Sequence, residues 1–259
     1  MTNVFWRSLG TGENTALALH CSLAHSGAWR GVSDALSPQL SLRTLDFPGH
    51  GKSQDWDGSG DFADCAFTAA ATGLVAPTDI VAHSFGAYIA LRLAAEFPDK
   101  VRRLVLYEPV FFAVLNDTHL ELAARNNAEM RHIAGLIALG DTALAARLFL
   151  RIWGDGTPWQ DLSKEVQDSF VRGIHLTCAI QPAIAEDNAD LLPRLSTIKA
   201  PVLLIDGGQS PEYMPKVQNI LAKLLPNAKR STVLGARHMG PITHATEVAG
   251  QILKHLIQS

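Results

Sequence analysis

The sequence has few cysteines and no long apolar run. Its 259 residues contain three cysteines, Cys21, Cys65 and Cys178, an odd number whose spacing matches no metal-binding motif. We therefore expect free thiols in a reducing compartment, and neither a disulfide framework nor a metal site. No uninterrupted apolar run approaches the roughly 20 residues that a membrane-spanning helix needs. A membrane-embedded protein is not expected.

Basic clusters are also missing. The net charge is −3, and the longest run of basic residues is Arg102-Arg103. A nucleic-acid partner is therefore not expected, because binding a polyanion requires a basic surface. The first residues, Met1–Ser8, lack a basic region followed by an apolar stretch, so they do not resemble a secretory signal. These features predict a cytoplasmic protein.

What the sequence does contain is apolar material for a large core. Hydrophobic residues make up 47% of the chain and charged residues 18%. At this length, such a composition predicts one large domain or a domain with an insertion. We find no internal repeat and no low-complexity segment, which disfavours a solenoid or a disordered linker.

Ser84 stands between a short apolar run and a helix-forming run. Ile80–Ala82 precedes it and Ala87–Phe97 follows it, so the chain is expected to pass from strand to sharp turn to helix. Such a turn needs small residues close to the serine, and Ala82 and Gly86 provide them. The turn predicts a strained serine backbone and an exposed Oγ at a helix N-terminus, where negative charge is stabilised. A serine that only caps the helix is the alternative.

Short apolar strands alternate with helical patterns along much of the chain. This alternation predicts an α/β fold with a mostly parallel, doubly wound sheet, whose ligands bind at the carboxyl ends of the strands. Val4–Leu9 is expected to form a hairpin arm that leads into the first central strand. The other expected strands are Ala16–Leu19, Leu42–Phe47, Ile80–Ala82, Val101–Tyr107, Pro201–Asp206 and Arg230–Gly235, and the helices are Phe62–Leu74, Ala87–Phe97, Met214–Leu225 and Thr246–Ile257.

The strand pattern disappears between residues 111 and 197. Helical spacing replaces it, and Gly140–Thr142 can end one helix and cap the next. Thr157–Gln160 has the form of a capping box with proline in the first turn. We therefore predict a helical insertion of about four helices at 111–197, within a core formed by 1–110 and 198–259.

Four motifs in this order resemble the α/β-hydrolase superfamily of serine hydrolases with a helical cap. They are an oxyanion-loop motif at His20–Ser22, the Asp-x-Pro-Gly-His-Gly-x-Ser turn at Asp46–Ser53, the nucleophile elbow at Ala82–Gly86 and the late Gly-x-x-His at Gly235–His238. Their joint occurrence is far more specific than any one of them. The resemblance covers the chain outside the insertion, and it implies that the insertion caps the active site.

The resemblance assigns roles to individual residues. Serine at neutral pH is a weak nucleophile and needs an adjacent base, which implies Ser84 as nucleophile and His238 as base. The backbone N–H groups of Phe85 and Ser22 are the implied oxyanion donors. Cys21 departs from the family pattern, which has glycine there, and this affects the geometry expected around Ser22.

The third member of the triad is the point at which the sequence departs most from the family. The acid usually follows the strand that corresponds to Pro201–Asp206, but Ser210 stands at that position. Some members of the superfamily take the acid from the end of the preceding strand, where this chain has Glu108. We therefore expect Glu108 to orient His238, with Asp206 as the alternative, and Glu212 or no acid as the remaining choices.

Several aromatic residues of the insertion are candidates for a substrate pocket. Aromatic and apolar side chains form most of the surface of small-molecule sites, although they fill the core of a helical cap equally well. The candidates, together with the residue that follows the expected catalytic histidine, are Phe111, Phe112, Trp153, Trp159 and Met239.

The resemblance implies a cofactor-free, metal-free serine hydrolase that acts on small carboxylic esters through an acyl-enzyme. Carbon–carbon bond hydrolysis, thioester cleavage and peroxidation on the same scaffold are the alternatives of the same class. A non-catalytic small-molecule receptor is the alternative of another class, because Ser210 stands where an acid is usual. The expected partner is a small-molecule substrate, and the expected state is a monomer or a homodimer.

Overall fold

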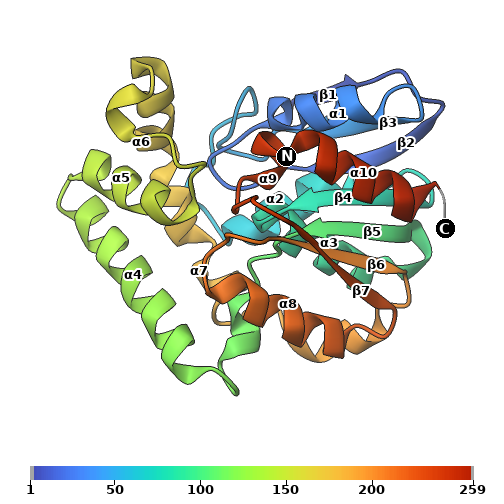
Figure 1. Ribbon diagram of the computed structural model, residues 1–259. Coiled ribbons are helices and arrows are strands. Elements are labelled where there is room, and N and C mark those ends of the chain that lie inside the picture. The colour runs from blue at the N-terminus through green and yellow to red at the C-terminus, as the bar shows by residue number, and fades with distance from the viewer. Residues whose placement is uncertain (1–2, 258–259) are drawn as a thin grey trace.

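Seven strands pair into one sheet in the order β1-β3-β2-β4-β5-β6-β7. The computed structural model describes residues 3–257 (Figure 1). The central strands β4, β5 and β6 are buried over most of their length, as the continuous apolar runs predict for a parallel sheet, whereas β7 is largely exposed. They are β1 (Trp6–Leu9), β2 (Asn14–Leu19), β3 (Leu40–Leu45), β4 (Thr78–His83), β5 (Val101–Tyr107), β6 (Val202–Gly207) and β7 (Ala228–Val233).

All the strand pairs are parallel except one. β1 runs antiparallel to β3, with Trp6 opposite Leu45 and Leu9 opposite Leu42. Our prediction of a hairpin between the first two strands is therefore wrong, because β3 lies between β1 and β2. The mostly parallel, doubly wound sheet is confirmed.

Two helices cover one face of the sheet. α1 (Arg30–Leu36) and α10 (Ala245–Leu256) pack on each other and on a cluster that includes Val32, Val105 and Ile252. The sequence analysis missed α1, which is only seven residues long. A pattern of 3.6 residues is too brief to recognise over two turns.

Three helices cover the opposite face: α2 (Phe62–Ala71), α3 (Phe85–Glu96) and α8 (Tyr213–Leu224). Ile89 of α3 and Leu204 of β6 both belong to the cluster on this side, and both are fully buried. α3 begins directly after Ser84 and is enclosed over most of its length. The residue before it is therefore held by one of the most rigid parts of the fold.

A helical segment is inserted between β5 and β6, and we call residues 111–197 the cap. Figure 1 shows α4 and α5 at the left, to one side of the sheet, with α6 above them. The cap has its own small cluster, which includes Met130, Ile133 and Ile174. Its helices are α4 (Leu120–Ala138), α5 (Thr142–Trp153), α6 (Lys164–Ala179) and α7 (Gln181–Ile184), and α9 (Gly240–Thr243) follows the last strand.

The helix ends in the cap agree only in part with the sequence. Gly140, with φ of +85°, follows the end of α4, and α5 begins at Thr142, as expected. Thr157–Gln160 does not begin a helix with a capping box, which corrects our prediction. α6 starts later, and Ser163 caps it by accepting a hydrogen bond from Val166 N at 3.4 Å.

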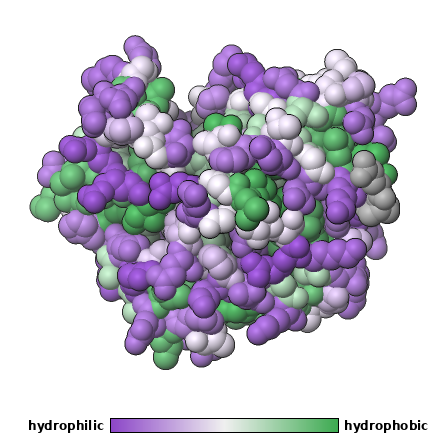
Figure 2. All heavy atoms as spheres, viewed as in Figure 1, coloured by the Kyte–Doolittle hydropathy of each residue, from purple (hydrophilic) through white to green (hydrophobic). Residues whose placement is uncertain are grey.

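Hydrophilic residues cover much of the face shown in Figure 2, with smaller hydrophobic groups between them. One such group lies at the left edge, over the turn that joins α4 and α5, where Leu139 is 83% exposed. Within residues 3–257, no helix combines the length and the apolar character that crossing a bilayer requires.

Candidate active site

The turn after β4 places Ser84 in a strained backbone conformation. Its φ of 57° and ψ of −118° lie outside the regions that L-residues favour. The side chain makes no capping hydrogen bond to α3, so Ser84 does not act as a simple helix cap. A Cβ at Gly86 would lie 2.5 Å from the carbonyl oxygens of Leu19 and His20, so the turn requires glycine there. The local structure leaves Oγ of Ser84 available to other groups.

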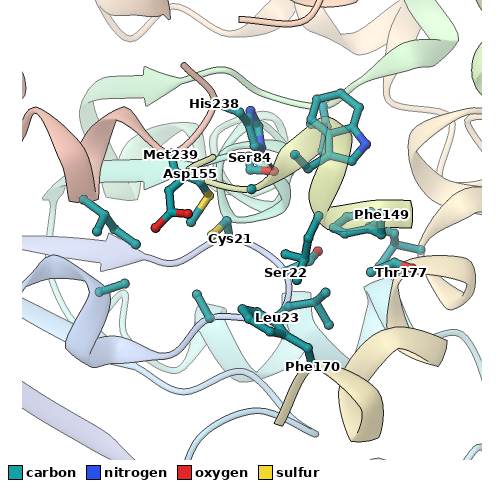
Figure 3. Close-up of a pocket in the computed structure, with 18 of the residues that line it drawn as sticks. Cys21, Ser22, Leu23, Ser84, Phe149, Asp155, Phe170, Thr177, His238 and Met239 are labelled. Atoms are coloured by element: carbon teal, nitrogen blue, oxygen red, sulfur yellow. Dashed lines mark hydrogen bonds between the residues drawn. The ribbon is translucent and has the colours of Figure 1, made fainter. Parts of the chain in front are cut away.

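Three side chains from distant parts of the chain meet at this turn. His238 Nε2 lies 3.0 Å from Ser84 Oγ (Figure 3). On the other side of the ring, His238 Nδ1 lies 2.6 Å from Glu108 Oε2. All three are at least 95% buried. A carboxylate can only accept, so the Nδ1 proton belongs on the side of Glu108, and Nε2 is left as an acceptor for the serine hydroxyl. The arrangement can move a proton from Ser84 to His238.

Glu108 is held rigidly just beyond the end of β5. Its φ is +47°, and its backbone N–H donates to the carbonyl of Ile205 at 2.9 Å. Its second carboxylate oxygen, Oε1, accepts from the backbone N–H of Gly207 at 2.8 Å. Both oxygens therefore have partners, which compensates for the burial of this side chain.

The other acids that we considered lie elsewhere. Asp206 accepts hydrogen bonds from Arg230 Nη2 at 2.8 Å and from Thr232 Oγ1 at 2.6 Å. Glu212 accepts from Arg125 Nη2 at 2.8 Å, at the surface. Ser210, at the position of the usual acid, has a buried hydroxyl without a hydrogen-bond partner among the described residues. Of these groups, the structure brings Glu108 to the histidine.

Two side chains hold the backbone around His238. Tyr107 OH donates to the carbonyl of Arg237 at 2.8 Å, and His83 Nε2 lies 2.8 Å from the carbonyl of His238. Burial, with a smaller contribution from His238, lowers the pKa of His83 well below its usual range, so His83 is neutral and donates through Nε2. A Cβ at Gly240 would overlap the Tyr107 hydroxyl.

The sequence analysis missed this pair of backbone anchors. The partners lie 130 and 155 residues apart, and no local pattern connects them.

Two backbone N–H groups are candidates for an oxyanion hole, because Ser22 lines the same cavity as Ser84 and Phe85 follows Ser84 in the chain. Phe85 N is the first N–H of α3, and Ser22 N belongs to the loop after β2. Neither donates a hydrogen bond within the described part of the chain. The next N–H of this loop, that of Leu23, is already bonded to His50 Nε2 at 3.1 Å. Burial lowers the pKa of His50 to about 4, which keeps this ring neutral and able to accept.

Other buried groups fix the same loop. Asp46 Oδ1 accepts from Ser26 N at 2.6 Å, and His20 Nε2 accepts from Phe47 N at 2.9 Å. Burial lowers the pKa of His20 to about 3, so it too is neutral. Cys21, which replaces the glycine of the family pattern, is buried, and burial raises the pKa of its thiol to about 12. Its thiol is therefore protonated at neutral pH.

A cavity of about 370 Å³ lies between the sheet and the cap and includes Ser84 and His238 in its wall. Figure 3 shows Ser22 and Leu23 from the core and Phe149 and Phe170 from the cap around it. Most of the residues in its wall are apolar, which suits a hydrocarbon chain.

Of the five residues that we predicted for the pocket, the cavity wall includes Phe112, Trp153 and Met239. The ring of Trp153 lies 4.8 Å from that of His238, centroid to centroid.

Two of the five predictions are wrong. Phe111 is fully buried in the main core, where its ring packs on Tyr88 at a centroid distance of 5.4 Å. Trp159 packs on the cap cluster around Met130 and Ile133. Both residues contribute to folding cores and not to the cavity. The apolar character of an aromatic residue does not tell which of these surfaces it joins.

No group of three or more His, Cys, Asp or Glu side chains within residues 3–257 is arranged to hold a metal ion.

Comparisons with known proteins show which family the chain resembles. The family model described as the alpha/beta hydrolase family matches residues 16–251. A pimeloyl-[acyl-carrier protein] methyl ester esterase from Nitrosomonas europaea is 29% identical over 80% of this chain and 81% of its own. One from Neisseria meningitidis is 31% identical over 86% of this chain and 72% of its own.

The fold also matches solved structures. A thermophilic esterase from Thermogutta terrifontis superposes with a TM-score of 0.77 over 99% of this chain and 94% of its own, at 18% identity. The chain therefore belongs to the alpha/beta hydrolase family, and it is a hydrolase.

Proposed function

We propose that the chain is a serine esterase, which hydrolyses carboxylic esters through an acyl-enzyme on Ser84. The observation that carries this proposal is the line of contacts from Ser84 Oγ to His238 and on to Glu108, at 3.0 and 2.6 Å. The names of the sequence relatives, which are methyl ester esterases, support the same reaction class.

In the first half of the reaction, Ser84 Oγ attacks the carbonyl carbon of the ester while His238 Nε2 takes the serine proton. Glu108 stabilises the resulting imidazolium by accepting from Nδ1. The N–H groups of Phe85 and Ser22 stabilise the negative charge that develops on the carbonyl oxygen. Collapse of the tetrahedral intermediate breaks the ester bond, and the alcohol leaves with the proton from His238.

In the second half, a water molecule attacks the acyl-enzyme. His238 takes a proton from this water, and the second tetrahedral intermediate collapses with release of Ser84, which recovers its proton. The products are one carboxylic acid and one alcohol, so the reaction consumes one water and needs no further reactant.

The wall of the cavity supports an acyl group as its occupant. Phe112, Phe149 and Trp153 surround the space beside the nucleophile with apolar surface. We propose esters of a small alcohol such as methanol, by analogy with the relatives named as methyl ester esterases. A receptor without catalysis was considered because Ser210 replaces the usual acid, and the contact between Glu108 and His238 supports the enzyme instead.

The test combines covalent labelling with turnover. Intact-mass measurement after treatment with a fluorophosphonate is expected to show one adduct on the wild type and none on Ser84→Ala. Hydrolysis of short- and medium-chain methyl and aryl esters is expected from the wild type alone. A folded wild type that takes no label and cleaves no ester would contradict the proposal.

A further inference from the structure

Two carboxamide side chains lie in the wall of the otherwise largely apolar cavity. Asn126, on α4, is 2% exposed, and its Nδ2 has no hydrogen-bond partner within residues 3–257. Gln181, at the start of α7, donates through Nε2 to the carbonyl of Thr177 at 2.9 Å. Its Oε1 is buried and also has no partner within the described chain. The cavity lining thus carries a spare donor and a spare acceptor.

These two atoms are costly to the folded protein as it stands. A buried polar group without a partner has lost its hydrogen bonds to water and gained none in return. The neighbouring wall residues, which include Phe112, Met130 and Ile180, cannot supply the missing bonds. A leucine at 126 would fill a similar volume without this cost. A hydrocarbon chain in the cavity would leave both atoms unpaired.

We propose that Asn126 and Gln181 form a polar subsite that binds a neutral hydroxyl or secondary amide on the acyl chain of the substrate. Either group accepts one hydrogen bond and donates another, so it can pair with Asn126 Nδ2 and Gln181 Oε1 together. A carboxylate fits less well, because it cannot donate and because none of the described residues around the cavity is lysine or arginine. This inference rests on the proposed esterase function, since it names the kind of acyl chain that the same cavity accepts.

Binding to the inactive variant Ser84→Ala tests the subsite without turnover. The ligands are methyl esters whose chains carry one hydroxyl or one secondary amide at successive carbons, each compared with the hydrocarbon ester of equal length. Calorimetry is expected to show, at one position along the chain, a Kd about tenfold lower for the polar ester than for its hydrocarbon partner. Adding Asn126→Leu or Gln181→Met is expected to abolish this preference while the hydrocarbon ester still binds.

Thr177→Val is the matched control. Thr177 also belongs to the cavity wall, but its hydroxyl already donates to the carbonyl of Ile174 at 2.7 Å. Its backbone carbonyl, which holds Gln181, is unaffected by the change. The preference for the polar ester is expected to persist in this variant. The melting temperature of Asn126→Leu is expected to equal or exceed that of its parent, because a buried unpaired amide is removed.

The outcomes separate the subsite from the esterase activity. Equal affinity for polar and hydrocarbon esters at every chain position would overturn the subsite, even if the wild type cleaves the esters. A preference that survives Asn126→Leu would do the same. If the wild type binds these esters with the expected preference but cleaves none, the esterase proposal fails and the subsite stands.

Discussion

The ends of β5 and β6 are neighbours in the sheet, and each carries a buried carboxylate with a different set of partners. Glu108, just beyond β5, contacts His238 and the N–H of Gly207. Asp206, the penultimate residue of β6, contacts Arg230 and Thr232 of β7. Both positions satisfy the rule that ligands bind at the carboxyl ends of parallel strands. The hydrogen-bond partners that each carboxylate already has therefore decide which of the two is available to His238.

The backbone explains the difference. Asp206 is still inside its strand, where it lies opposite Thr232 in register, so its side chain is directed to the cross-strand neighbour. Glu108 has left its strand and turns with φ of +47°, which frees its side chain from the pleat. Asp206 is therefore directed to the neighbouring strand β7, whereas Glu108 reaches the loop that carries His238.

The largest expected effect is on catalysis by Glu108→Gln. The amide keeps the shape but cannot hold the Nδ1 proton of His238 as a carboxylate does, so kcat is expected to fall by about 10³–10⁴-fold. Steady-state hydrolysis of an aryl ester measures this loss. Asp206→Asn is the matched control, and its kcat is expected to stay within about tenfold of the wild type. A larger loss of kcat in Asp206→Asn than in Glu108→Gln would contradict the assignment of Glu108 as the partner of His238.

A second experiment tests whether a carboxylate placed after β6 can replace Glu108 as the partner of His238. In the Glu108→Gln background, Ser210→Asp places a carboxylate at the position that the family usually employs. The unpartnered, buried hydroxyl of Ser210 shows that no existing hydrogen bond is lost within the described structure. We expect kcat to recover by about tenfold relative to Glu108→Gln alone. Ser210→Asn in the same background is the control, and equal recovery in both would exclude a role for the new charge.

A smaller effect is expected from Tyr107→Phe, at the last residue of β5. The change removes the hydroxyl that holds the carbonyl of Arg237, a contact of 2.8 Å. Because this bond positions His238 without touching substrate, kcat is expected to fall by about tenfold or less, with KM unchanged. Steady-state kinetics at several pH values would detect the change. A rise in KM at constant kcat would show that Tyr107 serves binding instead.

The smallest effect is on stability, at the end of β6. Asp206→Asn weakens the ion pair with Arg230, whose side chain is 32% exposed, so the free energy of unfolding is expected to fall by about 1 kcal/mol. Urea denaturation measures this difference. The double variant with Arg230→Gln tests the pairing, because the two losses are expected to be less than additive. Strict additivity would mean that the ion pair contributes nothing.

Much of the core could be predicted because its signals are local. Buried strands such as β6 are short apolar runs bounded by turn residues, and the elbow around Ser84 combines a strand, small residues and a helix within a few positions. The helices of the cap were also visible in their spacing. The predicted hairpin of β1, by contrast, was wrong because β1 pairs with β3, which comes later in the chain, and local sequence does not reveal which strands become neighbours.

The pocket was the least predictable part. Phe111 and Trp153 are both aromatic residues of the cap segment, yet one packs on Tyr88 in the core and the other borders the cavity. Asn126 was missed altogether, because a single asparagine in a helical pattern normally faces solvent. Asn126 is buried because it lies on the side of α4 that lines the cavity, and its neighbours in the chain do not indicate this.

Consecutive residues of the sequence were enough to predict the fold class and the sharp turn at Ser84, because turn residues and apolar periodicity are local signals. The resemblance of its motifs to the α/β-hydrolase superfamily added the roles of Ser84 as candidate nucleophile and His238 as candidate base. It favoured Glu108 as the acid, with Asp206, Glu212 or no acid left as alternatives. Only the tertiary structure decided which of them meets His238, because that contact joins residues 130 positions apart. A hydrogen bond requires two atoms within about 3 Å, and distance in space across a folded sheet is not encoded in any local pattern.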